Sequence, residues 1–136
     1  MMIVAEISAN HLGSFETAIR TIEAAADSGA DAVKIQTFNP SMMAIPDCRL
    51  TEGPWAGRDL VELYEEAYTP YEWHEDMFRY ARSIGLKMFS TPFDVTDIDF
   101  LEQYDCPIYK IASFEMLDLR LISRAAETGI SKLAIL

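Results

Sequence analysis

The chain has 136 residues, half of them apolar, and carries a net charge of −11. This length is enough for one domain with a hydrophobic core, and the apolar content is too high for a disordered chain. The acidic balance argues against nucleic acid and against anionic membranes as partners. A small anionic ligand remains compatible with it, because a few lysines in one pocket can outweigh a diffuse acidic exterior.

The sequence also argues against membrane insertion and secretion. No apolar run approaches the roughly 18 residues that cross a bilayer. The first residues lack a basic segment and a small-residue cleavage site, so no signal peptide is expected. Cys48 and Cys106 have neither CxxC nor metal-site spacing. Together these features predict a cytoplasmic protein with two free thiols.

Strand-like and helix-like segments alternate along the chain. In chain order we expect a strand at Ile3–Ser8, a helix at Phe15–Ser28, a strand at Asp31–Phe38, a long loop with several prolines and glycines, a short helix at Leu60–Ala67, a longer helix from Thr69-Pro70 to Ile84, a strand at Leu86–Phe93, a helix at Asp94–Tyr104, a strand at Pro107–Phe114, a helix at Leu117–Thr128 and a strand at Lys132–Leu136.

Capping residues support several of these boundaries. Ser14 stands where an N-cap is expected, and Gly29 where a helix would stop. Pro70 suits the first position of a helix. Asp94 or Thr96 is expected to cap the helix that follows the third strand.

The alternation predicts a parallel α/β sheet with right-handed crossovers. Neither GxGxxG nor GxxxxGK[ST] is present, which disfavours a Rossmann or P-loop nucleotide site. Four βα units plus a fifth strand amount to half of a (β/α)8 TIM barrel, which takes about 250 residues. The expected fold is therefore a partial TIM barrel. A fragment, two copies joined at open sheet edges and a small open sheet all remain possible forms of it.

Each of the first four strands carries polar side chains where a sheet covered on both faces is normally apolar. These residues are Glu6, Ser8, Lys34, Gln36, Ser90, Thr91, Lys110, Ser113 and Glu115. They come near the carboxyl ends of their strands, where barrels and open α/β sheets form their sites. Recurrence in four successive strands favours a shared site, although a buried ion pair of Glu6 with Lys34 or Lys110 is the alternative for any one of them.

The residue types indicate which ligand such a site would accept. Lys34 and Lys110, with the hydroxyls of Thr91 and Ser113, suit a molecule that carries both a phosphate and a carboxylate. Glu6 beside them is able to hold a water or to stabilise a developing cation.

The two histidines have weaker claims to a functional role. For His11, which follows the first strand, ligand contact and a hydrogen bond that stabilises the loop are both open. His74 lies on an expected helix with Trp73 and Phe78, so a core or interface position is expected.

Four motifs resemble the barrel domain of the sialic acid synthase family, in order and over essentially the whole chain. They are AEISANHLGS, GADAVKIQTF, FSTPF and YKIASFE. The stretch GPWAGRDLVELYEEAYTPYEWH is most similar to pseudaminic acid synthases within that family. The resemblance implies that residues 1–136 are the N-terminal portion of a TIM-barrel synthase domain, without its C-terminal half and its antifreeze-like domain.

The reaction that the resemblance implies is the condensation of phosphoenolpyruvate with an N-acylated amino-sugar aldose. The product is a nine-carbon α-keto acid of the pseudaminic or sialic acid type, and phosphate is released. A divalent metal, Mn²⁺ or Mg²⁺, is implied as the Lewis acid that polarises the aldehyde. The family's metal-binding histidines lie on later strands and His11 does not match them, so no metal ligand is expected in this chain.

Individual residues match positions of the family's site. Glu6 matches the catalytic glutamate that acts on the water or the cation. The phosphoenolpyruvate-binding positions are matched by Lys34, Thr91, Lys110 and Ser113. Gln36 and Glu115 match positions that contact the sugar or its metal. The alternative is a catalytically incomplete half-barrel that acts only as a binding or assembly fragment. Homodimerisation or self-association through open sheet edges is expected in either case.

Overall fold

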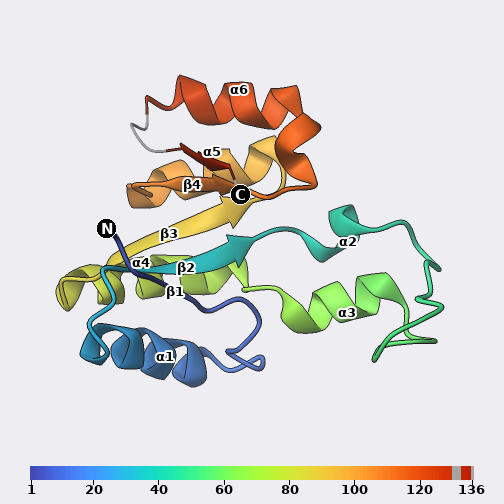
Figure 1. Cartoon of the computed structure of the whole chain (residues 1–136), viewed down its shortest axis with the longest axis horizontal. Helices are drawn as coiled ribbons and strands as arrows, with labels where there is room; N and C mark the ends of the chain where they lie inside the picture. The colour runs from blue at the N-terminus through green and yellow to red at the C-terminus, as the bar shows by residue number, and fades with distance from the viewer. Residues whose placement is uncertain (130–132, 136) are drawn as a thin grey trace.

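The computed structural model describes residues 1–129 and 133–135, so the expectations for Lys132 and Leu136 lie outside the described residues. Strands and helices alternate as expected (Figure 1). The strands are β1 (Val4–Glu6), β2 (Ala32–Thr37), β3 (Lys87–Pro92), β4 (Tyr109–Ile111) and β5 (Leu133–Ile135). The helices are α1 (Phe15–Asp27), α2 (Pro40–Met43), α3 (Leu60–Ala67), α4 (His74–Ser83), α5 (Val95–Leu101) and α6 (Leu119–Glu127). Three 3₁₀ turns are η1 (Tyr71–Trp73), η2 (Glu102–Tyr104) and η3 (Glu115–Leu117).

The five strands form one parallel sheet in the order β1-β2-β3-β4-β5. When right-handed crossovers always step in the same direction, all of their helices fall on one face of the sheet. The contacts agree, since α1 packs on β2 and on α4, α4 packs on β3, and α5 packs on β3 and on α6. This one-sided winding is that of a barrel and not of a doubly wound sheet. The expectation of a partial TIM barrel is confirmed.

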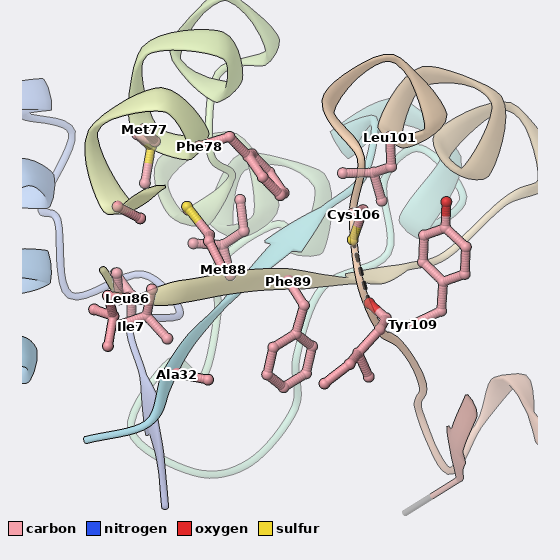
Figure 2. Packing of buried hydrophobic residues seen from close by; sticks show 14 of the residues in the cluster. Ile7, Ala32, Met77, Phe78, Leu86, Met88, Phe89, Leu101, Cys106 and Tyr109 are labelled. Atoms are coloured by element: carbon pink, nitrogen blue, oxygen red, sulfur yellow. Dashed lines mark hydrogen bonds between the residues drawn. The ribbon is translucent and has the colours of Figure 1, made fainter. Parts of the chain in front are cut away.

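Strand register decides which side chains face the helices. Val33 pairs with Met88 and Ser90 pairs with Tyr109, so these four lie on the helix-covered face. Figure 2 shows Met77 and Phe78 of α4 above Met88, and Leu101 of α5 near Tyr109. The alternate positions project to the opposite face, which in a closed barrel is the interior. The helix-covered face is therefore an apolar core, and the opposite face carries Ala32 and Phe89 together with the polar residues nearer the strand ends.

The cysteines are free thiols, as the sequence predicts. Cys106 is buried in the core, where its Sγ donates to the carbonyl oxygen of Ile108 at 3.2 Å (Figure 2). Burial raises the pKa of this thiol to about 11. The thiol therefore stays protonated at neutral pH and packs as a small apolar side chain.

The expected caps stand at three of the helix ends. Ser14 accepts a hydrogen bond from the Thr17 amide at the start of α1, and Gly29 follows the helix with a φ of +79°. Asp94, rather than Thr96, caps α5. These short-range signals could be read from the sequence because each cap depends only on residues a few positions away.

Several expected boundaries differ from those in the structure. The helix from Pro70 to Ile84 is split, because η1 occupies Tyr71–Trp73 and α4 begins only at His74. The loop after β2 contains the short helix α2, whose N-cap is Asn39. The fourth strand ends at Ile111, so Ser113 and Glu115 lie beyond it in a turn and in η3.

No helix in residues 1–129 has the length and apolar character to cross a membrane.

A polar network lies between α4 and the sheet, within the core. His74 is fully buried, and its Nδ1 donates to the carbonyl oxygen of Pro70 at 3.1 Å. Its Nε2 then has a lone pair that accepts from the Thr37 hydroxyl at 2.9 Å. Thr37 Oγ1 and Ser90 Oγ are 2.6 Å apart. The expectation of a core histidine is confirmed, and burial is the main cause that lowers its pKa to about 4.

The pKa of His74 predicts how stability depends on pH. The folded-state pKa lies below the ordinary 6.5, so the unfolded chain binds a proton first. The stability that depends on a neutral His74 is therefore complete above pH 6.5 and is lost as the pH falls toward 4. We expect His74→Gln to lose about 2 kcal/mol less unfolding free energy than the parent between pH 7.5 and pH 5. Urea unfolding at both pH values measures this difference, and equal losses in the two proteins would contradict it.

Candidate functional site

Three predicted residues on neighbouring strands are in direct contact. Lys34 of β2 forms an ion pair with Glu6 of β1, with Nζ 2.7 Å from Oε2. The same Nζ donates to Thr91 Oγ1 of β3 at 2.8 Å. Glu6 pairs in register with Lys34, and Thr91 pairs with Gln36, so all four residues point to the face opposite the helices. The parallel sheet thus brings together residues that are up to 85 positions apart.

The ion pair is largely shielded from water on the lysine side. The side chain of Lys34 is 12% exposed and that of Glu6 is 43% exposed. Burial lowers the pKa of Lys34, the contact with Glu6 raises it, and the positive charge of Lys110 lowers it further. Lys110 of β4 is therefore near enough to act on Lys34 electrostatically. The two lysines flank Thr91 on the strand between them.

A turn after β1 orients the Glu6 carboxylate. Ser8 adopts a left-handed conformation with a φ of +47°, and its backbone N–H and its hydroxyl donate to Glu6 Oε1 at 3.1 and 3.2 Å. The expectation that Ser8 belongs to the strand is wrong, since β1 ends at Glu6. Its contact with Glu6 is nevertheless direct. One carboxylate oxygen is held by Ser8 and the other by Lys34.

Two further predicted residues lie beside this cluster and have no hydrogen-bond or ion-pair partner among the described side chains. Gln36 is the register partner of Thr91, and Lys110 follows Tyr109, the register partner of Ser90. Both are partly buried. Within residues 1–129 and 133–135, the structure shows neither a side-chain hydrogen bond nor an ion pair for either one. The Gln36 amide and the Lys110 ammonium are therefore available to a ligand.

Ser113 and Glu115 are not brought into the cluster in the same direct way. Ser113 is exposed, and Glu115 begins η3. Oε2 of Glu115 is buried and has no hydrogen-bond partner among the described residues. A carboxylate oxygen in that state is costly unless something outside those residues pairs with it. Both residues follow β4 and thus lie on the carboxyl side of the strand that carries Lys110.

His11 stabilises the loop after β1. The ring is fully buried, its Nδ1 accepts from the Gly13 N–H at 3.1 Å, and it makes an edge contact with Trp73. Burial lowers the pKa of His11, and the carbonyl of Ala67 opposes that shift. Of the two alternatives open from the sequence, the structure shows the loop-stabilising hydrogen bond. In the described ranges no three His, Cys, Asp or Glu side chains come together as metal ligands.

Sequence reasoning missed Thr37 and was wrong in grouping Ser90 with the site residues, because Ser90 is buried on the helix-covered face, opposite Thr91. Thr37 bonds to Ser90 and to the His74 ring on the helix-covered face. The signal for them was present, because each is a hydroxyl residue directly beside a predicted site residue, Gln36 or Thr91. A threonine or serine in a strand is nonetheless compatible with many environments, so the connection to His74 becomes visible only in three dimensions.

The geometry predicts how Lys34 responds to its neighbours. Glu6→Gln removes the charge that raises the pKa of Lys34, so we expect that pKa to fall further below its ordinary value. The measurement is an NMR titration of the Lys34 side-chain resonances. Thr91→Val serves as the matched control, because it removes a hydrogen-bond acceptor without removing a charge, and it should shift the pKa less. An unchanged pKa in Glu6→Gln would contradict the coupling.

Comparison with known proteins identifies relatives of this chain. The NeuB family model matches residues 21–134. The chain is 47% identical over 131 residues to a pseudaminic acid synthase of Campylobacter jejuni strain 81-176, covering 91% of this chain and 38% of that protein. It is 46% identical over 130 residues to a pseudaminic acid synthase of Helicobacter pylori, covering 93% of this chain and 38% of that protein.

A solved structure supports the same relationship. The crystal structure of an N-acetylneuraminic acid synthetase from Leptospira borgpetersenii, in complex with citrate, superposes with a TM-score of 0.83 at 28% identity. The match covers 97% of this chain and 43% of that one. The chain thus spans about two fifths of the length of these proteins. Its sequence and its fold agree in showing that the chain belongs to the NeuB family, whose members include pseudaminic acid and sialic acid synthases.

Proposed function

We propose that this chain forms the phosphoenolpyruvate-binding part of a synthase of the pseudaminic or sialic acid type. The reaction joins phosphoenolpyruvate to an N-acylated amino-sugar aldose, and gives a nine-carbon α-keto acid and phosphate. In this proposal residues 1–136 are the N-terminal portion of a TIM-barrel domain. The names of its relatives support the product class, and 47% identity to a pseudaminic acid synthase favours the pseudaminic acid branch.

The observation that carries the proposal is the pair of lysines around Thr91. Lys34 already has one carboxylate partner, whereas Lys110 has no ion pair among the described residues; the pKa of Lys34 is lowered chiefly by burial and further by the positive charge of Lys110. Holding two partly buried positive charges together is unfavourable unless an anion offsets it. A ligand with a phosphate and a carboxylate supplies two negative groups, one for each ammonium.

The reaction needs a carboxylate near the same ligand, and Glu6 supplies it. When C3 of phosphoenolpyruvate attacks the aldehyde carbon, the C2–C3 π electrons form the new C–C bond, the π bond of the aldehyde breaks and its oxygen takes up a proton, and positive charge develops at C2. Glu6, oriented by Ser8 and Lys34, stabilises that charge and accepts a proton from the water that adds to C2. The adduct then releases phosphate and leaves the α-keto acid. Lys34, Lys110 and the Thr91 and Ser113 hydroxyls hold the phosphate and carboxylate throughout.

The sugar side of the site is less complete in this chain. Gln36 and the unpartnered Oε2 of Glu115 are the groups we assign to sugar contacts. The described residues do not fit the divalent metal that the family implies, because they contain no group of three His, Cys, Asp or Glu side chains that could bind it. We therefore assign no metal ligand to this chain and derive no step through the ion.

The overall reaction is tested with the protein expressed at its encoded length. In a buffer that contains Mn²⁺, we expect phosphate release that requires phosphoenolpyruvate and a 6-deoxy-diacetamido-altrose together. The aldose of the N-acetylneuraminate reaction is the matched comparison, and a pseudaminic acid synthase should release phosphate faster with the diacetamido sugar. Absence of phosphate release with both sugars would refute the enzymatic proposal.

Individual lysines are tested by binding. Lys34→Ala and Lys110→Ala each remove a charge-assisted contact, and each should weaken phosphoenolpyruvate binding by about 1.5–3 kcal/mol. Isothermal titration calorimetry measures this, with Lys87→Ala as the control, because Lys87 is an exposed residue at the opposite end of β3. Unchanged affinity in both variants would remove the assigned role from the lysines.

A binding or assembly role is the second candidate. It is favoured by the exposed apolar side chains after β4, where Phe114 is 95% and Leu117 is 83% exposed. Exposed apolar groups of this size in one segment are typical of surfaces that are covered by another part of a protein. Size-exclusion chromatography of the chain distinguishes the two, since a stable monomer would contradict a role that depends on self-association.

A further inference from the structure

The segment Pro70–His74 lies against the carboxyl ends of β2 and β3 on the side away from the proposed site. We infer that His74 and Tyr71 are positioning residues, which hold these two strand ends at the separation that the Lys34–Thr91 contact requires. The inference rests on the proposed function of that site, but it assigns a role to residues that are outside it. Neither residue contacts Lys34. Both act through residues that are close in sequence to the site residues.

His74 fixes the two strands through one chain of hydrogen bonds. The Pro70 carbonyl takes the proton of Nδ1, so Nε2 has to accept from the Thr37 hydroxyl. Thr37 Oγ1 then accepts from Ser90 Oγ at 2.6 Å, and Ser90 Oγ also lies 3.3 Å from the carbonyl oxygen of Ile35. Every polar side-chain atom in this buried chain has a partner. The direction of each bond follows from the first one.

This chain of bonds stands back to back with the proposed site. Thr37 directly follows Gln36, and Ser90 directly precedes Thr91. Because successive side chains of a strand point to opposite faces, the Thr37–Ser90 bond joins β2 to β3 behind the sheet while the Lys34–Thr91 bond joins them in front. A change in strand separation would stretch both bonds together.

Tyr71 fixes the turn that follows β3. Its hydroxyl donates to Asp97 Oδ1 at 2.6 Å, and Asp97 Oδ2 accepts from the N–H groups of Phe93 and Asp94 at 3.0 and 2.9 Å. Phe93 lies two residues beyond Thr91. The Tyr71 ring also stacks on the His74 ring, with centroids 5.8 Å apart. Both sides of the Pro70–His74 segment are therefore tied to the ends of strands that carry site residues.

Packing of apolar side chains would not require these buried hydrogen bonds. Burying hydroxyls and an imidazole is unfavourable unless each one is bonded, and apolar side chains of similar size would fill the same space. The gain from a fully bonded network is a defined geometry. Met77, which lies on the same helix and is equally buried, makes no such bonds in the described structure and serves as the contrast.

The test compares three variants of the full-length protein. His74→Leu fills the same space with an apolar side chain and removes both hydrogen bonds. We expect the affinity for phosphoenolpyruvate to fall by about tenfold. His74→Gln keeps an acceptor for the Thr37 hydroxyl and should restore most of the affinity. Met77→Val changes the same buried helix face without touching the network, and should bind as the parent does. Urea unfolding of each variant confirms that the binding is measured on folded protein.

A second readout does not depend on the ligand. If His74 positions the strand ends, His74→Leu loosens the Lys34–Thr91 contact, which favours the charged ammonium, and NMR titration should show the pKa of Lys34 falling further below its ordinary value. Tyr71→Phe, which removes only a hydroxyl, should produce a smaller shift in the same direction and carries the test if His74→Leu does not fold. Parent-like Lys34 titration in the folded variants would overturn the inference. Absence of phosphoenolpyruvate binding by the parent would instead refute the proposed function.

Discussion

The ion pair between Glu6 and Lys34 is the interaction on which the proposed site depends. A carboxylate in the first strand and a lysine in the second are unfavourable separately, and each is stabilised by the other across the β1–β2 register. Their contact requires β1 and β2 to be parallel neighbours, because the carboxyl ends of adjacent parallel strands then meet at one edge of the sheet. The alternation of strands and helices therefore determines the chemistry as well as the fold.

The two faces of the strand ends have different electrostatic characters. The front face holds Lys34 and Lys110, and the pKa of Lys34 is lowered chiefly by burial and further by the positive charge of Lys110. The rear face holds His74, which burial keeps neutral at physiological pH, since its pKa is about 4. A protonated imidazole behind these lysines would add a third positive charge. Neutral hydrogen-bonding groups position the strands without increasing that repulsion.

The sequence predicts the elements that depend on local signals. Ser14, Gly29 and Asp94 mark helix ends through contacts within a few residues, and their roles are as expected. The polar residues Lys34 and Thr91 also stood out, because a polar side chain is anomalous in a strand that should be apolar. For such residues the sequence alone supports both the fold and the position of the site.

Other features depend on tertiary contacts and could not be predicted. Pro70 reads as a first helical residue, but its carbonyl accepts from the His74 ring, and the chain forms η1 before α4 begins. Ser113 and Glu115 read as the end of a strand, but β4 pairs only over Tyr109–Ile111. In the first case the His74 ring is also held by Thr37, 37 positions away. In the second, the described residues pair with β4 only as far as Ile111, and in both cases the tertiary setting overrides a local preference.

The side chains without a bonding partner indicate what kind of ligand would complement them. Lys110 offers N–H donors and a positive charge, Gln36 offers an amide, and Glu115 offers a buried carboxylate oxygen; none has a bonding partner among the described residues. Lys110 requires a negative group, whereas Glu115 requires a hydroxyl, an amide N–H or a cation. No single small anion satisfies both. A pair of ligands does so, one of them anionic and the other rich in hydroxyl and amide groups, and phosphoenolpyruvate with an N-acylated sugar is such a pair.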